Sequence, residues 1–429
     1  LDKLGVEPQF GQRKEYKTAA DQLAAREITA ANREMMQRLA NSLCHDTVHL
    51  IARRRGSTTD DVWNALDAGL LTAHEALDRR LIDRIGYRDQ VYAAARDEWL
   101  SGRPAELRYV HRQRPAAHAL DKLRQRTQPS VAIVGVHGQI VRGRPQPSLG
   151  AGPVAASEAV CEQLRAAGRD ELVRAVVLQV ESPGGSYIAS DQIRREVLQL
   201  KASGRPVVAS MGDVAASGGY FVAMGATEIV AQPSTLTGSI GVLAGKMVLT
   251  GLKQKLGLLS EDITSGAWAG FLSGNREFTA AEWDALNRWL DAVYADFTEK
   301  AAADRGLPVE ELEPLARGRV WTGADAAERR LVDHLGGLAL AHRRACALAE
   351  LDPDEAPLRP LTHPLLSRLI PAKSSESPHL STSVPRTATG SLDAALASAG
   401  SDELLGTLAA RLGLAPAGVL SLPFHIRVQ

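Results

Sequence analysis

The feature that most constrains the fold of this chain is an internal repeat with a constant spacing. Residues 26–39 (REITAANREMMQRL) resemble residues 276–290 (REFTAAEWDALNRWL), and residues 73–86 (AHEALDRRLIDRIG) resemble residues 323–336 (GADAAERRLVDHLG). Both pairs are separated by 250 positions, from 26 to 276 and from 73 to 323. Because two distant matches share one spacing, they indicate the duplication of a whole structural unit.

A further match extends the repeat toward the start of the chain. The tripeptide KLG occurs at residues 3–5 and again at 255–257, a spacing of 252. We therefore expect the C-terminal part of a first copy, a linker rich in Arg, Pro and His, a complete second copy, and a disordered low-complexity tail. The expected bounds of these four parts are residues 1–98, 99–128, 129–350 and 351–429.

Composition narrows the classes of function. Fifty basic and fifty acidic residues cancel, so no overall field attracts nucleic acid or an anionic membrane. The three cysteines, Cys44, Cys161 and Cys346, are far apart and predict neither a disulfide framework nor a metal site. No apolar run approaches the roughly 20 residues that span a bilayer. Since the chain begins at Leu1 rather than methionine, it can be a fragment, and whether a longer parent protein has a membrane anchor stays an open question.

Within the second copy, apolar strand-like runs alternate with helical patterns. The strand-like runs are residues 130–138, 173–182, 205–211 and 227–232, and residues 190–204 carry apolar side chains at helical spacing before a glycine. This alternation predicts an α/β fold with a mainly parallel sheet covered by helices. Ligands bind such sheets at the carboxyl ends of the strands.

Two glycine-rich segments follow predicted strands at that edge. They are ESPGGS at 181–186 and GDVAASGGY at 212–220, which we expect to form loops. An oxyanion hole needs backbone N–H groups without neighbouring side chains, so Gly185 and Gly218 are its candidate donors. Ser217 would open the next helix, where the helix dipole favours negative charge, and is the candidate nucleophile. The alternative is that Ser217 only caps the helix and the glycines only form turns.

No histidine is well placed in the sequence to serve as the base of Ser217. His45 and His49 lie one helical turn apart, a spacing compatible with a metal pair. Their counterparts in the second copy are Ala295 and Glu299, and no third ligand is evident. We therefore interpret both as ordinary histidines on a helix face and predict no metal site.

Three motifs together resemble those of the signal peptide peptidase A family, also called protease IV. They are ESPGGS, GDVAASGGYFVAMGA at 212–226 and PSTLTGSIGV at 233–242, and the resemblance covers residues 1 to about 350. It implies a Clp protease/crotonase-like fold in tandem copies, of which the first is incomplete at its N-terminus. It also implies a serine endopeptidase that degrades apolar peptides such as cleaved signal peptides.

The resemblance implies a Ser–Lys dyad, with the serine from the second copy and the lysine from the first. The motif KEYKTAAD at 14–21 supplies Lys17 as that lysine. With the spacing of 252, Lys17 corresponds to Ala269, so the second copy lacks an equivalent base. Lys14 is a neighbouring competitor for the role, and Glu15 stands where relatives often carry glycine.

Other expectations also come from the resemblance. Ser239, in TGSIGV, is a candidate for orienting the lysine amine, with a plain turn serine as the alternative. The implied partners are apolar peptides and further copies of the chain, which would assemble into a ring such as a tetramer. Nucleic acid is not an expected partner. No cofactor is expected. Association with a bacterial membrane is implied by the family only, and a cytoplasmic location is the alternative.

Two other functions remain open at this point. A crotonase-like enzyme acting on acyl-CoA would use the same sheet and glycine-rich loops, although it needs no serine nucleophile. A catalytically inactive, truncated protease could instead act as an assembly or binding subunit, because the front of the first copy is missing from the sequence.

Overall fold

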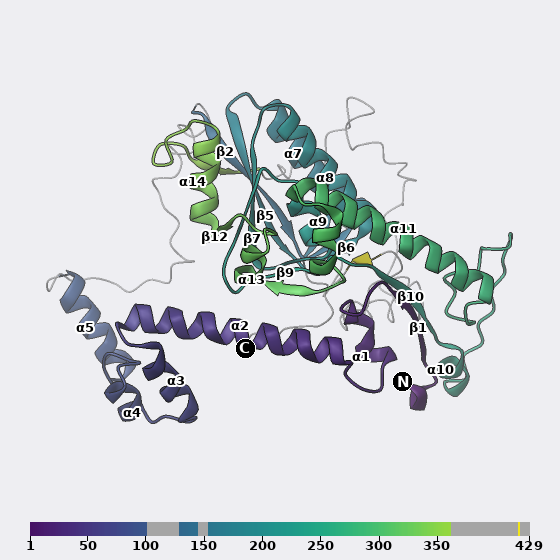
Figure 1. Cartoon of the computed structure of the whole chain (residues 1–429), viewed down its shortest axis with the longest axis horizontal. Helices are drawn as coiled ribbons and strands as arrows, with labels where there is room; N and C mark the ends of the chain where they lie inside the picture. The colour runs from purple at the N-terminus through teal and green to yellow at the C-terminus, as the bar shows by residue number, and fades with distance from the viewer. Residues whose placement is uncertain (101–127, 145–152, 362–418, 421–429) are drawn as a thin grey trace, which may run out of the picture. The chain divides into compact units, whose positions relative to one another are not determined.

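The computed structural model describes residues 1–100, 128–144, 153–361 and 419–420 (Figure 1). The chain divides into two compact units, one formed by residues 1–40 with 128–429 and the other by residues 41–127. The first unit holds the candidate nucleophile, base and oxyanion donors named above, so most of the description concerns it.

An eight-stranded sheet forms the centre of the first unit. Its neighbouring strands pair in parallel, except that the edge strand β11 is antiparallel to β9. In spatial order the strands are β13 (Leu358–Pro360), β2 (Ser130–His137), β5 (Val173–Ser182), β7 (Val207–Ala216), β9 (Leu236–Gly238) and β11 (Val320–Thr322), with β8 (Glu228–Ala231) beside β7 and β12 (His334–Leu335) beside β8.

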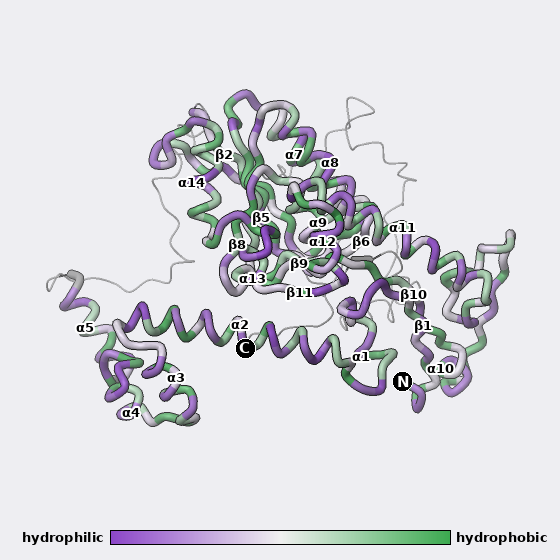
Figure 2. Tube along the Cα trace, in the orientation of Figure 1, coloured by the Kyte–Doolittle hydropathy of each residue, from purple (hydrophilic) through white to green (hydrophobic). Residues whose placement is uncertain are grey.

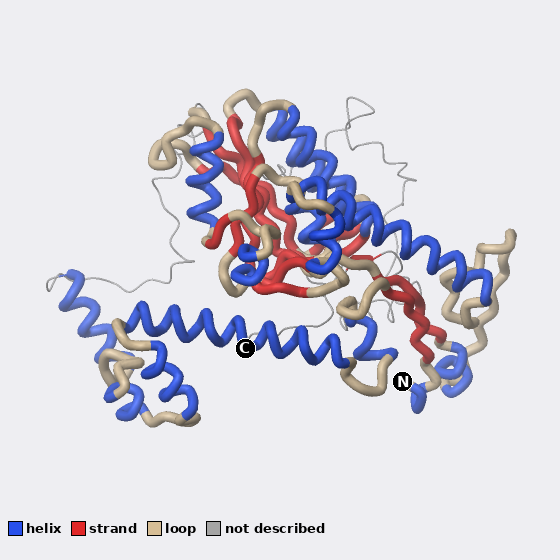
Figure 3. The backbone as a smooth tube through the Cα atoms, in the orientation of Figure 1, coloured by secondary structure: helices blue, strands red, loops and turns tan. Residues whose placement is uncertain are grey.

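Helices cover both faces of this sheet, because its central strands are apolar on both sides (Figures 2 and 3). On β5, Ala175 and Val177 pack against α14 (Leu338–Leu348), whereas Val176 and Leu178 face the other way. That second face is covered by α7 (Ser157–Arg169), α8 (Tyr187–Ala202), α9 (Gly218–Met224) and α11 (Ala280–Arg305). The alternation of side chains along a strand therefore builds two core layers.

A second sheet joins the two copies of the repeat. Its order is β1 (Glu7–Gln12), β10 (Leu243–Val248), β14 (Val419–Leu420), β6 (Gly185–Ser186), β3 (Gln139–Val141) and β4 (Val154–Ala156). Strand β1, from the first copy, is antiparallel to β10, from the second, with Glu7 opposite Val248 and Gln12 opposite Leu243. This pairing places β1, and the segment after it that contains Lys17, beside the second copy.

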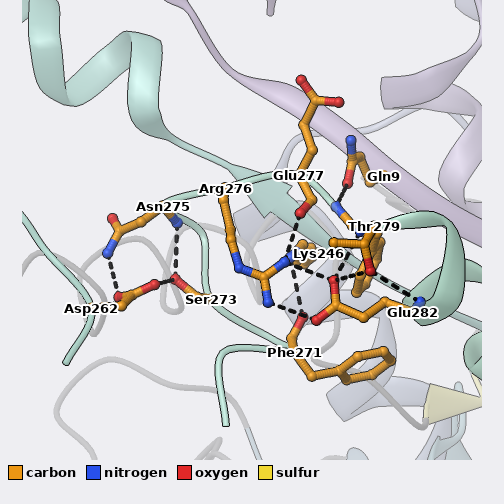
Figure 4. A network of polar contacts seen from close by, with 11 residues as sticks. Gln9, Lys246, Asp262, Phe271, Ser273, Asn275, Arg276, Glu277, Thr279 and Glu282 are labelled. Atoms are coloured by element: carbon orange, nitrogen blue, oxygen red, sulfur yellow. Dashed lines mark hydrogen bonds and ion pairs between the residues drawn. The ribbon is translucent and has the colours of Figure 1, made fainter. Parts of the chain in front are cut away.

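Polar contacts hold β1 and β10 against the loop that precedes α11 (Figure 4). The side-chain oxygen of Gln9 accepts a hydrogen bond of 2.7 Å from the Phe278 N–H, and the Lys246 amine lies 4.1 Å from the centre of the Phe278 ring. Arg276 donates to both carboxylate oxygens of Glu282, at 2.7 and 2.6 Å. Burial lowers the pKa of Lys246. The strand that leads to Lys17 is thereby fixed to the second copy.

The second unit is a small helical assembly. It contains the end of α2 (Ala30–Arg55), followed by α3 (Thr59–Asp67), α4 (Ala73–Asp78) and α5 (Arg88–Leu100). Thr58 and Thr72 each form a capping box at the start of α3 and α4, which satisfies the first N–H groups of those helices. A small apolar cluster packs the end of α2 against α3.

Short elements complete the described part of the first unit. They are the 3-10 turns Asp2–Leu4, Thr18–Ala20 and Glu313–Leu315 and the helices α1 (Asp21–Ala24), α10 (Thr250–Lys255), α12 (Val309–Leu312) and α13 (Gly323–Glu328). Among the described residues, no helix has both the length and the apolar character required to cross a bilayer.

The predicted α/β fold class is confirmed, and its strand-like runs form β2, β5, β7 and β8. Three boundaries differ from expectation. In the expected loop at 181–186, residues 181–182 end β5 and residues 185–186 form β6. Residues 212–216 belong to strand β7 rather than to a loop, because Val214–Ala216 pair with β9. Ordered structure also continues past residue 350, since β13 pairs with β2 and Ala356 is buried. Most of the expected linker and most of the expected tail lie outside the described residues.

Candidate active site

Ser217 lies in a strained turn between β7 and α9. Its backbone has φ 56° and ψ −115°, a region that residues other than glycine rarely adopt and that costs about 1–3 kcal/mol. Hydrogen bonds on both sides of the residue hold the turn, from Ser217 N to Gly238 O at 2.8 Å and from Phe221 N to Ser217 O at 2.8 Å. The turn sets a buried hydroxyl at the N-terminus of α9, as the sequence predicted.

The glycines beside Ser217 are required by close packing. A Cβ atom at Gly218 would lie 2.7 Å from Ser190 Oγ and 3.0 Å from Gly185 N. One at Gly219 would lie 2.6 Å from Ser182 O. Since real Cβ atoms do not approach other atoms so closely, the two segments can meet only through bare backbone.

Gly185 and Gly218, the candidate oxyanion donors, are therefore neighbours in space. Gly185 has φ 157°, and a Cβ atom there would lie 2.0 Å from Ile140 O in the adjacent strand β3. Gly218 is the first residue of α9, where backbone N–H groups have no carbonyl partner within the helix. Donors from a strand and from a helix N-terminus thus meet beside Ser217.

Lys17 brings the first copy into contact with Ser217. Its Nζ atom lies 2.8 Å from Ser217 Oγ and 3.0 Å from Ser239 Oγ, and donates to Ser239 O at 3.1 Å. All three side chains are fully buried. Burial lowers the pKa of the Lys17 amine well below its ordinary value, because the charged form loses its hydration.

Two glycines that the sequence reasoning missed make room for Lys17. A Cβ atom at Gly318 would lie 2.5 Å from Lys17 N, and one at Gly241 would lie 3.2 Å from Lys17 Cδ. Gly318 also has φ 79°, a backbone conformation that favours glycine. The only signal in the sequence was the presence of glycine in GSIGV and ARGRV, which by itself does not indicate contact with a lysine.

The competing lysine, Lys14, points elsewhere. Its Nζ atom lies 3.0 Å from Glu313 Oε1, and its side chain is partly exposed. Glu15, which stands where relatives often carry glycine, forms an ion pair of 3.0 Å with Arg317. The segment therefore directs Lys14 and Glu15 to surface partners and Lys17 to the interior.

Glu181 is a further residue near the site that the sequence reasoning missed. Its carboxylate accepts hydrogen bonds from the N–H groups of Asp213 at 2.8 Å and Val214 at 3.3 Å. These N–H groups lie where the pairing of β5 with β7 shifts register, between Val180 and Ser182. Partial burial raises the pKa of Glu181. This carboxylate supports the end of β7 that leads into Ser217.

The histidine pair on α2 has no third candidate ligand among the described residues. The rings of His45 and His49 stack with their centres 4.6 Å apart. In the part of the chain that the structure describes, no group of three or more His, Cys, Asp and Glu side chains could hold a metal ion. The cysteines Cys44, Cys161 and Cys346 are free thiols.

The chain is similar to several known proteins. The model of peptidase family S49 matches residues 1–100 and 199–352. The chain is 34% identical over 354 residues to "Serine protease SPPA, chloroplastic" of Arabidopsis thaliana, which covers 82% of this chain and 51% of that protein. It is 32% identical over 362 residues to "Protease 4" of Salmonella typhi, covering 82% and 57%.

A third relative is shorter. It is the "Putative signal peptide peptidase SppA" of Enterococcus faecium, 33% identical over 174 residues, which cover 41% of this chain and 51% of the relative. The chain thus spans about half the length of these relatives. The Arabidopsis thaliana relative is a serine protease by name, and the family match includes both the segment with Lys17 and the segment with Ser217. The chain belongs to peptidase family S49.

Proposed function

We propose that this chain is a serine endopeptidase in which Ser217 is the nucleophile and Lys17 the general base. The observation that carries the proposal is the 2.8 Å contact between Lys17 Nζ and Ser217 Oγ. The two residues are 200 positions apart in sequence, and both are fully buried. An ordinary lysine stays at the surface with its charge hydrated, so a buried lysine against a strained serine favours catalysis.

The lowered pKa of Lys17 supports its role as a base. A lysine at its reference pKa of about 10.4 is protonated at neutral pH and cannot accept a proton. In the neutral form, Lys17 would take the proton of Ser217 Oγ while that oxygen forms a bond to the substrate carbonyl carbon. The Lys17 ammonium would then give this proton to the leaving amine as the peptide bond breaks. Water, deprotonated by the same amine, would release the acyl group from Ser217.

The N–H groups of Gly185 and Gly218 are the proposed donors to the oxyanion. A carbonyl oxygen that becomes negative between them would be stabilised by the start of α9 as well. Ser239 is the proposed positioning residue for the base. Its carbonyl and hydroxyl oxygens lie 3.1 and 3.0 Å from Lys17 Nζ, so they would direct the amine lone pair toward Ser217.

The proposed substrates are apolar peptides in extended form, such as cleaved signal peptides. The name of the Enterococcus faecium relative, a putative signal peptide peptidase, supports this class of substrate. Assembly into a ring and association with a bacterial membrane are part of the same proposal and rest on the family alone.

The test is cleavage of an apolar signal-peptide-like peptide between pH 6 and pH 10. Ser217→Ala and Lys17→Ala should each lose at least about 1000-fold in kcat/KM, because the two groups act as one unit. Lys14→Ala is the matched control and should keep normal activity, since Lys14 pairs with Glu313 at the surface. Turnover by the unmodified chain should rise with pH as the Lys17 amine loses its proton.

Other outcomes would select the alternatives. Near-normal turnover by folded Lys17→Ala would reject the dyad. A folded protein without turnover on any apolar peptide would favour an inactive assembly subunit. Tight binding of a CoA ester would favour the crotonase-like enzyme, although that chemistry has no use for a buried Ser–Lys pair.

A further inference from the structure

The residue before the proposed base is held in a cluster of three side chains. Tyr16 donates a hydrogen bond from its hydroxyl to Glu34 Oε2 at 3.0 Å, and Arg319 donates to Glu34 Oε1 at 2.5 Å. The Arg319 guanidinium also lies over the Tyr16 ring, 4.7 Å from its centre. Each of these three side chains therefore contacts the other two, and we call them the Tyr16 cluster.

The members of the Tyr16 cluster come from three separate parts of the chain. Tyr16 follows β1, Glu34 lies near the start of α2, and Arg319 directly precedes β11. Partial burial opposes ionisation of Glu34, but the hydrogen bonds from Arg319 and Tyr16 outweigh it and lower the pKa of Glu34. Glu34 is therefore a carboxylate at neutral pH. A charged acceptor makes both hydrogen bonds stronger than bonds between neutral groups.

The backbone next to the cluster leads directly to the contacts of Lys17. The N–H group of Tyr16 donates to Arg317 O at 3.2 Å, and the N–H group of Ser239 donates to Arg319 O at 2.7 Å. Ser239 is the residue whose two oxygen atoms lie beside Lys17 Nζ. Arg319 thus holds Tyr16 through its side chain and Ser239 through its carbonyl group, one on each side of Lys17.

The repeat shows that the cluster needs both copies. With the spacing of 252, the counterpart of Tyr16 in the second copy is Trp268. With the spacing of 250, the counterpart of Arg319 in the first copy is Gly69, which has no side chain to supply a cation. The cluster therefore combines Tyr16 of the first copy with Arg319 of the second, as the proposed dyad combines its two residues.

We propose that Glu34 is a positioning residue for the base, because its carboxylate holds Tyr16 and Arg319 together and thereby fixes the backbone on both sides of the Lys17 amine. The role of that amine as a base rests on the proposed function, whereas the hold of the cluster on these segments does not. A displacement of about 1 Å in a reacting group can cost about 100-fold in rate. A residue that does not touch the substrate can therefore control kcat.

The first experiment needs no turnover. Amide hydrogen exchange is followed by mass spectrometry in the full chain, in peptides that cover residues 14–20 and 237–241. Glu34→Ala removes hydrogen bonds to a charged group, so exchange in both segments should become about tenfold faster. Glu34→Gln keeps an oxygen that accepts from Arg319, and its exchange should stay within about threefold of the unmodified chain.

Arg38→Ala is the matched control. Arg38 lies one turn further along α2 and forms an ion pair with Asp325 of the second copy, as Glu34 does with Arg319. The two α2 side chains are similarly exposed, at 48% for Arg38 and 51% for Glu34. Arg38→Ala therefore removes a comparable contact between α2 and the second copy while every member of the Tyr16 cluster stays. It should leave both the exchange of the two segments and kcat unchanged.

The second experiment measures kcat and KM on an apolar peptide. Glu34→Ala should lower kcat about 10- to 100-fold and change KM by less than about twofold, because the displaced group is the amine and not the peptide. Tyr16→Phe loses the hydroxyl but keeps the ring beside Arg319, so it should lower kcat only about 3- to 10-fold. Glu34→Gln should restore kcat to near its normal value.

Several outcomes would overturn the proposal. One is exchange in Glu34→Ala that is no faster than in Arg38→Ala, and another is normal kcat in folded Glu34→Ala. An equal fall of kcat in both variants would also overturn it and assign the effect to the docking of α2 as a whole. Absence of turnover by the unmodified chain would instead reject the proposed function, while the exchange comparison still tests the hold of the cluster on Lys17.

Discussion

The two copies of the repeat build the same local contact in different surroundings. Arg55 donates to the carboxylate of Asp83 at 3.1 and 2.8 Å, and Arg305 donates to Asp333 at 3.1 and 2.5 Å. The Asp83 side chain is 79% exposed, whereas that of Asp333 is 31% exposed. The helices and the turn can therefore form the contact by themselves, but they do not determine how deeply it is buried.

The difference in burial comes from the sheet. In the second copy, Asp333 accepts a hydrogen bond of 2.7 Å from Ile229 N, and the next residues form β12, which pairs with β8. In the first copy, the residues after Asp83 form no strand within the described part of the chain. This repeat unit therefore has a helical part that forms by itself and a part that depends on a sheet.

Around the proposed base the relation is reversed, because here the first copy is structured and the second copy is exposed. The first copy supplies β1, which pairs with β10, and Lys17. The counterpart of β1 in the second copy, residues 259–264, forms no strand, and Leu259 and Ile263 there are almost completely exposed. Each copy has thus kept one of the two contributions to the candidate site.

The largest effect is expected from moving the lysine between copies. Lys17→Ala combined with Ala269→Lys should remain at least about 1000-fold less active than the unmodified chain, because the exposed position 269 offers no contact with Ser217. The measurement is kcat/KM on an apolar peptide, with Ala269→Lys alone as the control. Recovery of activity in the double variant would show that the copies are interchangeable at this position.

A smaller loss of rate is expected at the oxyanion glycines, which only the second copy provides. Gly185→Ala should lower kcat about 100- to 1000-fold, because its Cβ atom would meet Ile140 O at 2.0 Å and displace the N–H donor. Gly86→Ala, in the first copy, is the control and should keep normal kcat. Unchanged kcat in folded Gly185→Ala would remove this glycine from the proposed site.

The difference in burial between the two copies can be tested with one matched pair of leucines. Leu331 is fully buried, whereas its counterpart Leu81 is only partly buried. Leu331→Ala should lower the free energy of unfolding by about 3 kcal/mol, and Leu81→Ala by about 1 kcal/mol. Urea denaturation followed by circular dichroism measures both. Equal losses would mean that the first copy buries this face against something beyond the described contacts.

The smallest expected effect is the contribution of Lys17 to the pH dependence of the stability of the protein. The unfolded chain binds a proton at this lysine up to about pH 10.4, and burial makes that proton unfavourable in the folded chain. The unmodified protein should therefore gain stability relative to Lys17→Met as pH rises from 7 to 10. Thermal unfolding of both proteins, with Lys14→Met as a control, gives the difference. A difference independent of pH would mean that Lys17 keeps its ordinary pKa.

Local patterns predicted much of the fold, and the repeat predicted part of the site. Apolar runs indicated β2 and β5, and the small residues around Ser217 indicated a tight turn before a helix. The resemblance to the family's motif named Lys17 as the expected base, and the spacing of 252 supported it because the second copy has Ala269. The strands and the turn depend on residues that are neighbours in sequence, and the support for Lys17 comes from comparison of the two copies. Both kinds of information are present in the sequence itself.

Contacts between distant segments could not be predicted in this way. Gly318 lies against Lys17 and β14 pairs with Gly185, yet neither segment carries a pattern that names its partner. Glu181 supports two N–H groups that are free only because β7 changes register. Such contacts are set by how the whole chain packs, so the sequence indicated the residue types but not their neighbours.

The pairing of β1 with β10 also orders events during synthesis. Lys17 leaves the ribosome 200 residues before Ser217, and β1 must wait for β10 before it can pair. Contacts between such distant segments form late in folding. A growing chain therefore carries the Lys17 amine without the Ser217 hydroxyl, and the proposed dyad forms only after the second copy has been synthesised. For the proposed endopeptidase, this delay would keep a new molecule from cutting itself or its neighbours before it is folded.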